Sequence, residues 1–300
     1  MNILESHEGK LTRIGVFYDG NYFSHVSNYY LYHHQRKARI NIQGLHQFII
    51  AEASKAENSM TRHCRIVDAH YFRGRLSASE TKSRNALYSE RVFDEVLMRE
   101  GIITHYLPLQ GGGEKGIDVW LALEAFELAI YKRFDVSVLI AGDGDYLPLI
   151  RKLNTLGTRV MILGWDFTYT DKNGMEKMTR TAQTILDEAT YPVLMNTVID
   201  DRSRKSDPLI ENLFLKPKYV SDTNEKDNRK RVETIRGTVC NIKDGYGFIK
   251  PDKGSENIFF HYSDVVDMDF NELSNGDSVE FEKGTNEKGV CAKEVKVIKT

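Results

Sequence analysis

Short apolar runs alternate with segments of helical periodicity through the first two thirds of this sequence. The runs are rich in Val, Ile and aromatic residues, as strands are, and they cover residues 13–19, 65–72, 102–108, 136–142 and 159–165. Apolar residues recur at helical spacing over residues 41–57, 84–100, 117–133 and 146–156. This alternation predicts an α/β fold, a doubly wound and mainly parallel sheet with helices on both faces.

Aspartates stand where the predicted strands end. Asp19 ends the first strand, Asp143 and Asp145 follow the fourth, and Asp118 opens a helical segment after a run of glycines. Ligands of such sheets bind outside the carboxyl ends of the strands, so these four residues are candidates for a binding site. We call them the aspartate cluster. Clustered carboxylates need a counter-charge, and a set of oxygen ligands favours Mg²⁺ or Mn²⁺.

Each aspartate taken alone also has an ordinary structural explanation. The run from Gly142 to Asp145 is typical of a turn with a helix cap, and a single aspartate after a strand is equally ambiguous. Three separate segments meet at one rim only in the predicted topology. That convergence favours a metal site.

Three segments carry a resemblance to a known family. VFYDGNYF, KGIDVWLALEAF and VLIAGDGDYLPLIRKLNTLGTRVMILG are similar to the signature segments of the NYN domain family, relatives of the PIN nucleases, across most of residues 12–190. The resemblance implies a metal-dependent acidic site and endonucleolytic cleavage of RNA. It makes Asp19, Asp118 and Asp143 metal ligands, with Asp145 a fourth ligand or a supporting carboxylate.

Other positions match the family pattern or depart from it. The resemblance gives Asn21 a role in fixing a water or a phosphate oxygen, and it gives Lys115 a role in balancing a phosphate, although an exposed lysine beside a glycine loop is unremarkable. Related domains often have Ser or Thr where this chain has Ala141. A helical acid of PIN relatives has two candidates here, Asp94 and Glu90, and neither is assigned.

Basic residues gather just past the second predicted strand. They are Arg73, Arg75, Lys82 and Arg84. They are candidates to hold a nucleic-acid backbone, and a solvated helix start explains them equally well. His33 and His34 are adjacent, so they do not share a helix face as paired metal ligands would, and the insertion over residues 28–40 has no assigned role.

The pattern changes after residue 190. Periodicity weakens over residues 191–231, and the second half of this segment is polar and mixed in charge, which predicts a flexible connector. Short strands with frequent turn residues follow. We therefore expect a nuclease-like domain over 10–190, a connector over 191–231 and a small antiparallel barrel over 232–300.

Two aromatic segments of the C-terminal region, KDGYGFIKP and ENIFFHYSDV, have strand periodicity. Tyr246 and Phe248 share one face, as do Phe259 and His261, and glycines 245 and 247 are expected to leave that face unobstructed. Exposed aromatic residues on a sheet stack against unpaired bases. An aromatic stripe at this spacing is also typical of a barrel core.

Both aromatic segments resemble the two ribonucleoprotein motifs of the cold-shock domain, with a match over about residues 234–298. The resemblance implies an OB-like five-stranded barrel that binds single-stranded RNA or DNA. It makes the stacking residues Tyr246, Phe248, Phe259, His261 and Tyr262, with Lys243 and Lys250 near the backbone. One departure is that Asn241 or Ile242 sits where bacterial cold-shock proteins usually have a Trp-Phe pair.

Composition limits the role of charge. The formal net charge of the chain is −2, and the region from Val232 onward has 9 Lys and Arg against 13 Asp and Glu, a balance of −4. We therefore expect modest affinity, carried by stacking. The three cysteines are far apart, and neither a secretion signal nor an apolar run of membrane-spanning length is evident, so a cytoplasmic location is expected.

The sequence thus predicts a metal-dependent endoribonuclease, a phosphodiester hydrolase whose cold-shock domain captures single-stranded RNA. Homodimerisation through the NYN domain is a further expectation, and DNA stays open as a ligand. The alternative is a non-catalytic RNA-binding regulator, which Ala141 and the unassigned helical acid keep open. A phosphatase with an aspartyl nucleophile is disfavoured, because Asn21 stands where its second aspartate should be.

Overall fold

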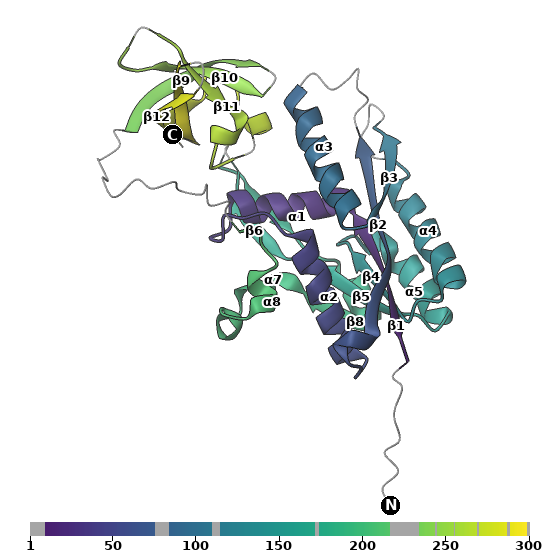
Figure 1. Cartoon of the computed structure of the whole chain (residues 1–300). Coiled ribbons are helices and arrows are strands. Elements are labelled where there is room, and N and C mark those ends of the chain that lie inside the picture. The colour runs from purple at the N-terminus through teal and green to yellow at the C-terminus, as the bar shows by residue number, and fades with distance from the viewer. Residues whose placement is uncertain are drawn as a thin grey trace, which may run out of the picture. The chain divides into compact units, whose positions relative to one another are not determined.

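The computed structural model describes residues 10–75, 84–109, 115–171, 174–216, 234–243, 245–254, 256–268, 270–286 and 289–298. Within these ranges the chain divides into two compact units, and each is described by itself (Figure 1). The first is built around a parallel sheet and is called the α/β unit. The second contains a closed barrel.

A six-stranded parallel sheet forms the centre of the α/β unit, with the strand order β3-β2-β1-β4-β5-β8. The strands are β1 (Thr12–Asp19), β2 (Cys64–Arg75), β3 (Ile103–Pro108), β4 (Val136–Ile140), β5 (Arg159–Gly164) and β8 (Tyr191–Leu194). The chain starts in the middle with β1, builds outward through β2 and β3, and then returns to place β4 on the other side of β1. The direction of winding therefore reverses between β1 and β4.

Helices connect these strands. They are α1 (Gly20–Tyr32), α2 (Ile42–Ala56), α3 (Arg84–Arg99), α4 (Ile117–Lys132), α5 (Leu147–Thr155), α6 (Gln183–Glu188), α7 (Met195–Asp200) and α8 (Pro208–Glu211). A two-stranded antiparallel hairpin is formed by β6 (Phe167–Thr170) and β7 (Glu176–Thr179). In the part of the chain that the structure describes, no helix combines the length and the apolar character needed to cross a bilayer.

The central strand β1 is buried on both faces, which is why its sequence is almost continuously apolar. Phe17 belongs to one core cluster together with Leu121 of α4. Tyr18 points to the opposite face, where its ring contacts those of Phe23 in α1 and His46 in α2 at centroid distances of 5.3 and 6.1 Å. Helices therefore cover both faces of the sheet, and the predicted doubly wound α/β fold is confirmed.

Sequence periodicity located five of the six strands of the sheet and helices α2 to α5. It missed β8, the hairpin strands β6 and β7, helix α1 and the short helices α6 to α8. Helix α1 is rich in Tyr, Ser, Asn and His, which are weak helix formers. Strand β8 is only four residues long and starts at Tyr191, where the connector was predicted to begin. The α/β unit continues beyond it, because Phe214 forms a bridge with Ile40. The more polar stretch of the predicted connector, residues 217–231, lies outside the described residues.

The barrel is closed, with the strand order β10-β11-β13-β12-β9. Its strands are β9 (Thr234–Lys243), β10 (Tyr246–Pro251), β11 (Ile258–His261), β12 (Ser278–Asn286) and β13 (Gly289–Val297). All pairs are antiparallel except β11 with β13, which is parallel. Ile249, Phe260 and Phe281 lie fully buried in its core. The predicted small barrel is confirmed, with one parallel pair in an otherwise antiparallel set.

Candidate acidic site and nucleic-acid interface

The acidic candidates lie at the point where the sheet reverses its winding. Tyr18 of β1 pairs with Ile140 of β4, so the two strands end level with each other. Asp19 is the last residue of β1, and Asp143 follows Ile140 by three residues. In open α/β sheets the crevice between two such strands is the ordinary ligand site.

The hydroxyl of Tyr146 joins two carboxylates of the aspartate cluster. It donates a hydrogen bond to Oδ1 of Asp118 over 2.9 Å, and Oδ2 of Asp19 lies 3.4 Å from the same oxygen. Tyr146 is 1% exposed. Burial, followed by the charges of Asp19 and Asp118, raises the pKa of Tyr146 well above its ordinary value. The phenol therefore stays protonated and remains a donor to the carboxylates at any physiological pH.

The turn after β4 supplies the other two aspartates. Asp143 caps the 3₁₀ turn Gly144–Tyr146, where its Oδ1 accepts a hydrogen bond of 3.0 Å from the backbone N–H of Asp145. Both aspartate side chains are exposed to solvent. Asp143 therefore does cap a turn, as its sequence context indicates, and this hydrogen bond uses only one of its two carboxylate oxygens.

The donor set of the aspartate cluster is made of carboxylate oxygens, which fits a hard divalent cation. Asp118, Asp143 and Asp145 are exposed and have no Lys or Arg partner within 4.0 Å among the described residues. The carboxylates of the cluster do not, however, bring three ligand atoms within 4.8 Å of one another, whereas a separate group of described residues does so. Tyr146 holds two of the carboxylates near each other by a hydrogen bond instead.

Tyr22 contacts both Asp19 and the turn after β4. Its backbone N–H donates to Oδ1 of Asp19 over 3.0 Å, and its hydroxyl accepts a 2.7 Å hydrogen bond from the backbone N–H of Trp165. Burial raises the pKa of Tyr22 to about 12. A Cβ on Gly142 would lie 2.6 Å from the ring of Tyr22, so the ring and the turn after β4 fit only because residue 142 has no side chain.

On the barrel, three aromatic rings form one surface across β10 and β11. Phe248 pairs with Phe259, and Tyr246 pairs with His261. The ring centroids of Tyr246, Phe248 and Phe259 lie 5.5 to 6.0 Å apart, and all three side chains are half-buried. These residues are therefore not core residues, and we call the three rings the aromatic face.

The opposite side of the same strands fills the barrel. Phe260 is fully buried, and a Cβ on Gly247 would lie 2.5 Å from its ring. The expectation that Gly247 keeps the aromatic face open was wrong, because the glycine points inward and makes room for Phe260. Gly245 has a φ of +79° and serves the turn between β9 and β10. Tyr262 also packs partly against the barrel core, unlike the rings of the aromatic face.

Comparison with known proteins assigns both units. The family model of the NYN domain matches residues 13–187, which is more than half of the chain. The chain belongs to the NYN domain family. A second model, described as the 'Cold-shock' DNA-binding domain, matches residues 235–298. The protein therefore joins a nuclease-type NYN domain to a nucleic-acid-binding cold-shock domain, as the resemblance implied.

Individual relatives match the cold-shock domain. The major cold shock protein of Micrococcus luteus is 43% identical over 61 residues, which are 20% of this chain and 91% of that protein. A cold shock-like protein of Escherichia coli (strain K12) is 40% identical over 66 residues, or 21% of this chain and 96% of the relative. A solved structure of a protein of unknown function from Vibrio parahaemolyticus aligns at a TM-score of 0.39 and 20% identity, covering 62% of this chain and 93% of the other.

Three further predicted residues of the NYN domain lie in described segments, and two of them are close in sequence to members of the aspartate cluster. Asn21 is exposed in the first turn of α1, two residues after Asp19, and Lys115 is exposed three residues before Asp118. Arg73 is half-buried within β2, beside Tyr71. The strand is longer than predicted and includes Arg73, so this arginine does not lie past its end.

Arg75 and Asp94 form an ion pair with each other. The guanidinium of Arg75 donates to both carboxylate oxygens of Asp94 over 2.7 and 2.9 Å and stacks on the ring of Tyr106, with 3.7 Å from Cζ to the centroid. The hydroxyl of Tyr106 donates to the same carboxylate. One candidate for the helical acid is therefore tied into an ion pair. Lys82 lies outside the described residues, as does the side chain of Arg84.

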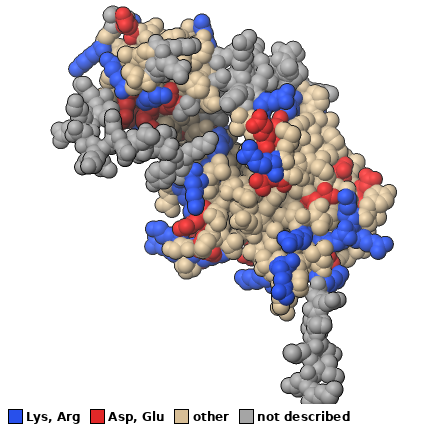
Figure 2. Space-filling view, in the orientation of Figure 1, with Lys and Arg blue, Asp and Glu red and all other residues tan. Residues whose placement is uncertain are grey.

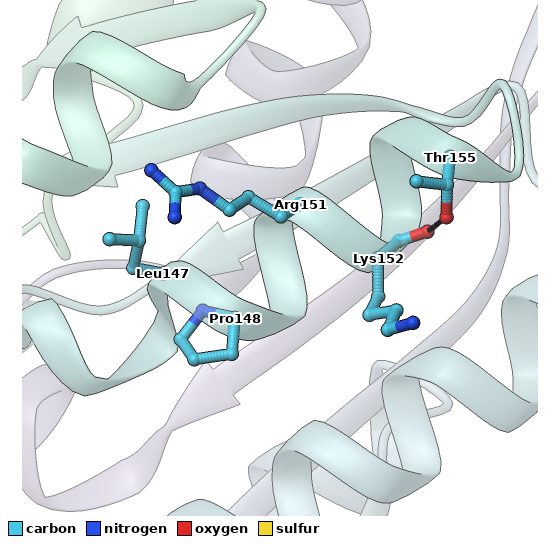
Figure 3. Close-up of a pocket in the computed structure, with 5 residues that line it drawn as sticks. All are labelled: Leu147, Pro148, Arg151, Lys152 and Thr155. Carbon is cyan, nitrogen blue, oxygen red and sulfur yellow. Dashed lines mark hydrogen bonds between the residues drawn. The ribbon is translucent and has the colours of Figure 1, made fainter.

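A shallow pocket of the NYN domain lies on α5 rather than at the aspartate cluster. It is lined by Leu147, Pro148, Arg151, Lys152 and Thr155 (Figure 3). Arg151 pairs with Glu188 at 3.0 Å, and Thr155 donates to the backbone oxygen of Lys152 within the helix. The polar groups of this pocket are thus partly used in local bonds, and none of its residues is a predicted site residue.

Proposed function

We propose that this protein is a metal-dependent endoribonuclease whose cold-shock domain captures single-stranded RNA. The observation that carries the proposal is the meeting of Asp19 and Asp118 at one buried hydroxyl, at the reversal point of the sheet. Asp143 stands on the same turn as that hydroxyl. Separate parts of the chain thus bring carboxylates to the place where this fold binds ligands.

Asp19, Asp118 and Asp143 would hold Mg²⁺ or Mn²⁺, with Asp145 as a fourth ligand or a supporting carboxylate. Such an ion supplies an activated water and offsets charge on a phosphodiester. Asp143 retains one oxygen for this role, because only its Oδ1 serves the turn. Tyr146 keeps Asp19 and Asp118 directed toward each other. Asn21 would fix a water or a phosphate oxygen, and Lys115 would balance the charge of a phosphate.

Capture of RNA would rest on the aromatic face, with His261 alongside Tyr246. Stacking on an aromatic residue contributes about 1–3 kcal/mol per base. Lys243 and Lys250 are exposed on β9 and β10 and would contact the backbone. Since Tyr262 packs partly on the core, we give it a smaller share. A weak binder in the same chain raises the local concentration of RNA at the NYN domain, so neither domain needs high affinity alone.

The alternative is an RNA-binding regulator that cleaves nothing. The hydrogen bonds of the aspartates are compatible with it, because Asp143 caps a turn and Asp118 accepts a hydrogen bond from the hydroxyl of Tyr146. The separation of the carboxylates favours it. Both readings require RNA binding, so only cleavage separates them.

Cleavage of an end-labelled unstructured RNA by the full chain, in Mn²⁺, in Mg²⁺ and in EDTA, is the deciding test. We expect cutting within the RNA that needs metal and is abolished by Asp143→Asn. Asparagine also caps helical turns, so this substitution removes the charge and keeps the fold. The matched control is Asp201→Asn, because exposed Asp201 caps another 3₁₀ turn through the N–H of Ser203. Retained RNA binding without cleavage in any metal would establish the regulator instead.

We further propose a homodimer formed through α4. Val119, Leu123 and Ile130 are spaced four and seven residues apart along one side of this helix and are 63, 64 and 47% exposed. An apolar stripe of this kind is costly to leave in water, and a second copy would cover it. Light scattering should give twice the chain mass for the wild type and the single chain mass for Leu123→Glu. A monomeric wild type at micromolar concentration would refute this part.

We place the protein in the cytoplasm. Cys64, Cys240 and Cys291 are all free thiols, and Cys240 is exposed. An exposed thiol fits a reducing compartment. Fractionation of cells that produce the chain would test the assignment.

A further inference from the structure

A second group of ligating side chains lies beneath α4, apart from the aspartate cluster. His70 is on β2, His105 on the edge strand β3 and Glu124 two turns into α4. Each offers one ligand atom, and these atoms all lie within 4.8 Å of one another. His70 is 3% exposed, while His105 and Glu124 are half-buried. The group therefore opens toward solvent at the edge of the sheet.

The surrounding bonds orient His70 as metal-bound histidines are oriented. Its Nε2 lies 3.1 Å from Oδ1 of Asp68, whose Oδ2 is 3.3 Å from Nζ of Lys132. A carboxylate that accepts the N–H of a histidine leaves the other ring nitrogen with its lone pair free for a ligand. That nitrogen, Nδ1 of His70, lies 2.9 Å from Nε2 of His105. The carboxylate of Glu124 is the third donor.

The spacing of the two nitrogens is close to what a tetrahedral ion requires. With Zn–N bonds of about 2.0–2.1 Å, two ligands of a tetrahedral site lie about 3.3 Å apart. The present 2.9 Å has to widen by a few tenths of an ångström, which a residue on an edge strand can accommodate. His105 would then carry its proton on Nδ1 instead of Nε2, so no proton is lost from the pair.

Aromatic packing fixes both imidazole planes. His70 stacks on Phe17 at 5.5 Å, and His105 stacks on Phe72 at 4.3 Å with an interplanar angle of 5°. Trp120 of α4 meets the ring of His105 edge-on at 4.9 Å. Burial lowers the pKa of His70 and of His105, which favours the neutral imidazole, the form that binds metals.

We propose that His70, His105 and Glu124 form a binding site for one divalent transition-metal ion of the Zn²⁺ type, with water in the fourth position. Two imidazoles and a carboxylate favour such an ion over Mg²⁺. The ion ties the edge strand β3 and helix α4 to β2, so its binding adds to the stability of the NYN domain. The site is distinct from the aspartate cluster in both position and ligand type, and it does not depend on the proposed nuclease activity.

The test is a titration of the metal-stripped full chain with Co²⁺ as a coloured probe, in excess Mg²⁺ to occupy carboxylate sites. We expect one equivalent of Co²⁺ with the strong visible absorption of tetrahedral nitrogen and oxygen ligation, displaced by Zn²⁺. Zn²⁺ should also raise the melting temperature. Glu124→Gln and His105→Gln should each weaken binding at least tenfold, while Glu127→Gln, an exposed glutamate on the same helix, should leave it unchanged.

Several outcomes would overturn the site. One is the absence of stoichiometric Co²⁺ or Zn²⁺ binding. A second is equal binding by the wild type, Glu124→Gln and His105→Gln. A third is loss of the signal in Asp143→Asn, which would place the ion at the aspartate cluster instead. Circular dichroism of each variant shows that it is folded, and Glu124→Gln keeps the proposal testable if His105→Gln does not fold.

Discussion

The hydroxyl of Tyr146 illustrates how one atom can organise charges that come from distant parts of the chain. Asp19 and Asp118 are 99 positions apart in sequence, yet both lie within 3.4 Å of this oxygen. Because burial and the two carboxylates raise the pKa of this hydroxyl, it stays protonated and donates hydrogen bonds to them. The residue is therefore central to the geometry of the site without being one of the acids.

Tyr146→Phe should separate the role of this hydroxyl from the fold. The substitution removes one oxygen from a side chain that is 1% exposed, and the ring continues to fill the core. A hydrogen bond to a charged group contributes about 1.5–3 kcal/mol, so we expect Mn²⁺ affinity and cleavage rate to fall by about tenfold or more. Titration calorimetry and initial rates measure the two effects. Wild-type values for both would show that the carboxylates are held by other contacts.

Two glycines of the same turn should respond differently to alanine. In Gly142→Ala the new Cβ would meet the ring of Tyr22 at 2.6 Å, whereas in Gly144→Ala the nearest atoms lie at 3.4 Å. Overpacking costs about 1–3 kcal/mol, so we expect that loss of unfolding free energy for Gly142→Ala and little change for Gly144→Ala. Urea unfolding gives both values. Equal stability of the two variants would contradict the packing argument.

Sequence reasoning could find the four aspartates because each follows a strand or opens a helix, and those positions are visible in local periodicity. It could not find Tyr146, which in the sequence is one more aromatic residue at the start of a helix. His70 and His105 were missed for another reason. They are brought together by the pairing of neighbouring strands, and residues 35 positions apart carry no spacing signal.

At the scale of elements, one face of β10 and β11 packs into the barrel core, and the other carries the aromatic face. Phe259 and Phe260 are neighbours in sequence, but Phe259 belongs to the aromatic face and Phe260 to the core. Because side chains alternate between the two faces of a strand, Phe259 lies on the outer face and Phe260 in the barrel interior. This pair provides an internal control for the nucleic-acid interface.

Phe259→Ala should weaken binding of single-stranded RNA without unfolding the barrel. The loss of one stacking ring predicts about 1–3 kcal/mol, or roughly 5- to 150-fold in affinity. Phe260→Ala should instead destabilise the cold-shock domain by about 3–5 kcal/mol, because it empties the core. Fluorescence anisotropy and denaturant unfolding distinguish the two effects. Wild-type RNA affinity of a folded Phe259→Ala variant would move the interface elsewhere on the barrel.

Five of the six sheet strands could be predicted, because a parallel sheet buried on both faces leaves nearly continuous apolar runs in the sequence. Helix α1 escaped because Tyr, Ser and Asn weaken its helical signal, and packing of Tyr18 on Phe23 supplies the stability instead. Strand β8 was not predicted, because four residues are too few to show periodicity. The omission of α1 thus reflects tertiary packing that overrides local preference, whereas that of β8 reflects its length.

At the scale of the whole molecule, the charges are nearly balanced. The net charge is −2, and acidic and basic side chains are interspersed over the face seen in Figure 2. On the described residues of that face, basic side chains do not gather into one large patch (Figure 2). We therefore expect binding to depend on local contacts, chiefly those of the aromatic face and of Lys243 and Lys250.

The salt dependence of RNA binding should be shallow. Two phosphate contacts, from Lys243 and Lys250, predict a slope of about −1.4 in a plot of log K against log salt, since each contact to a single strand contributes about −0.7. Lys250→Gln should reduce the magnitude of that slope by about 0.7. Anisotropy titrations at several KCl concentrations give the slopes. A wild-type slope beyond about −3 would require more phosphate contacts than these lysines supply.

The short turn after β4 has an evolutionary consequence. Asp143 and Asp145 are exposed, so replacing their charges costs the fold little, while the neighbouring Tyr146 is buried. If Asp143 holds the metal as proposed, one nucleotide change in its codon is enough to remove cleavage and to leave the fold and the cold-shock barrel intact. Under the proposed function, chains of this kind that lose the carboxylate at position 143 are expected to bind RNA without cutting it, and to do so with an unchanged fold.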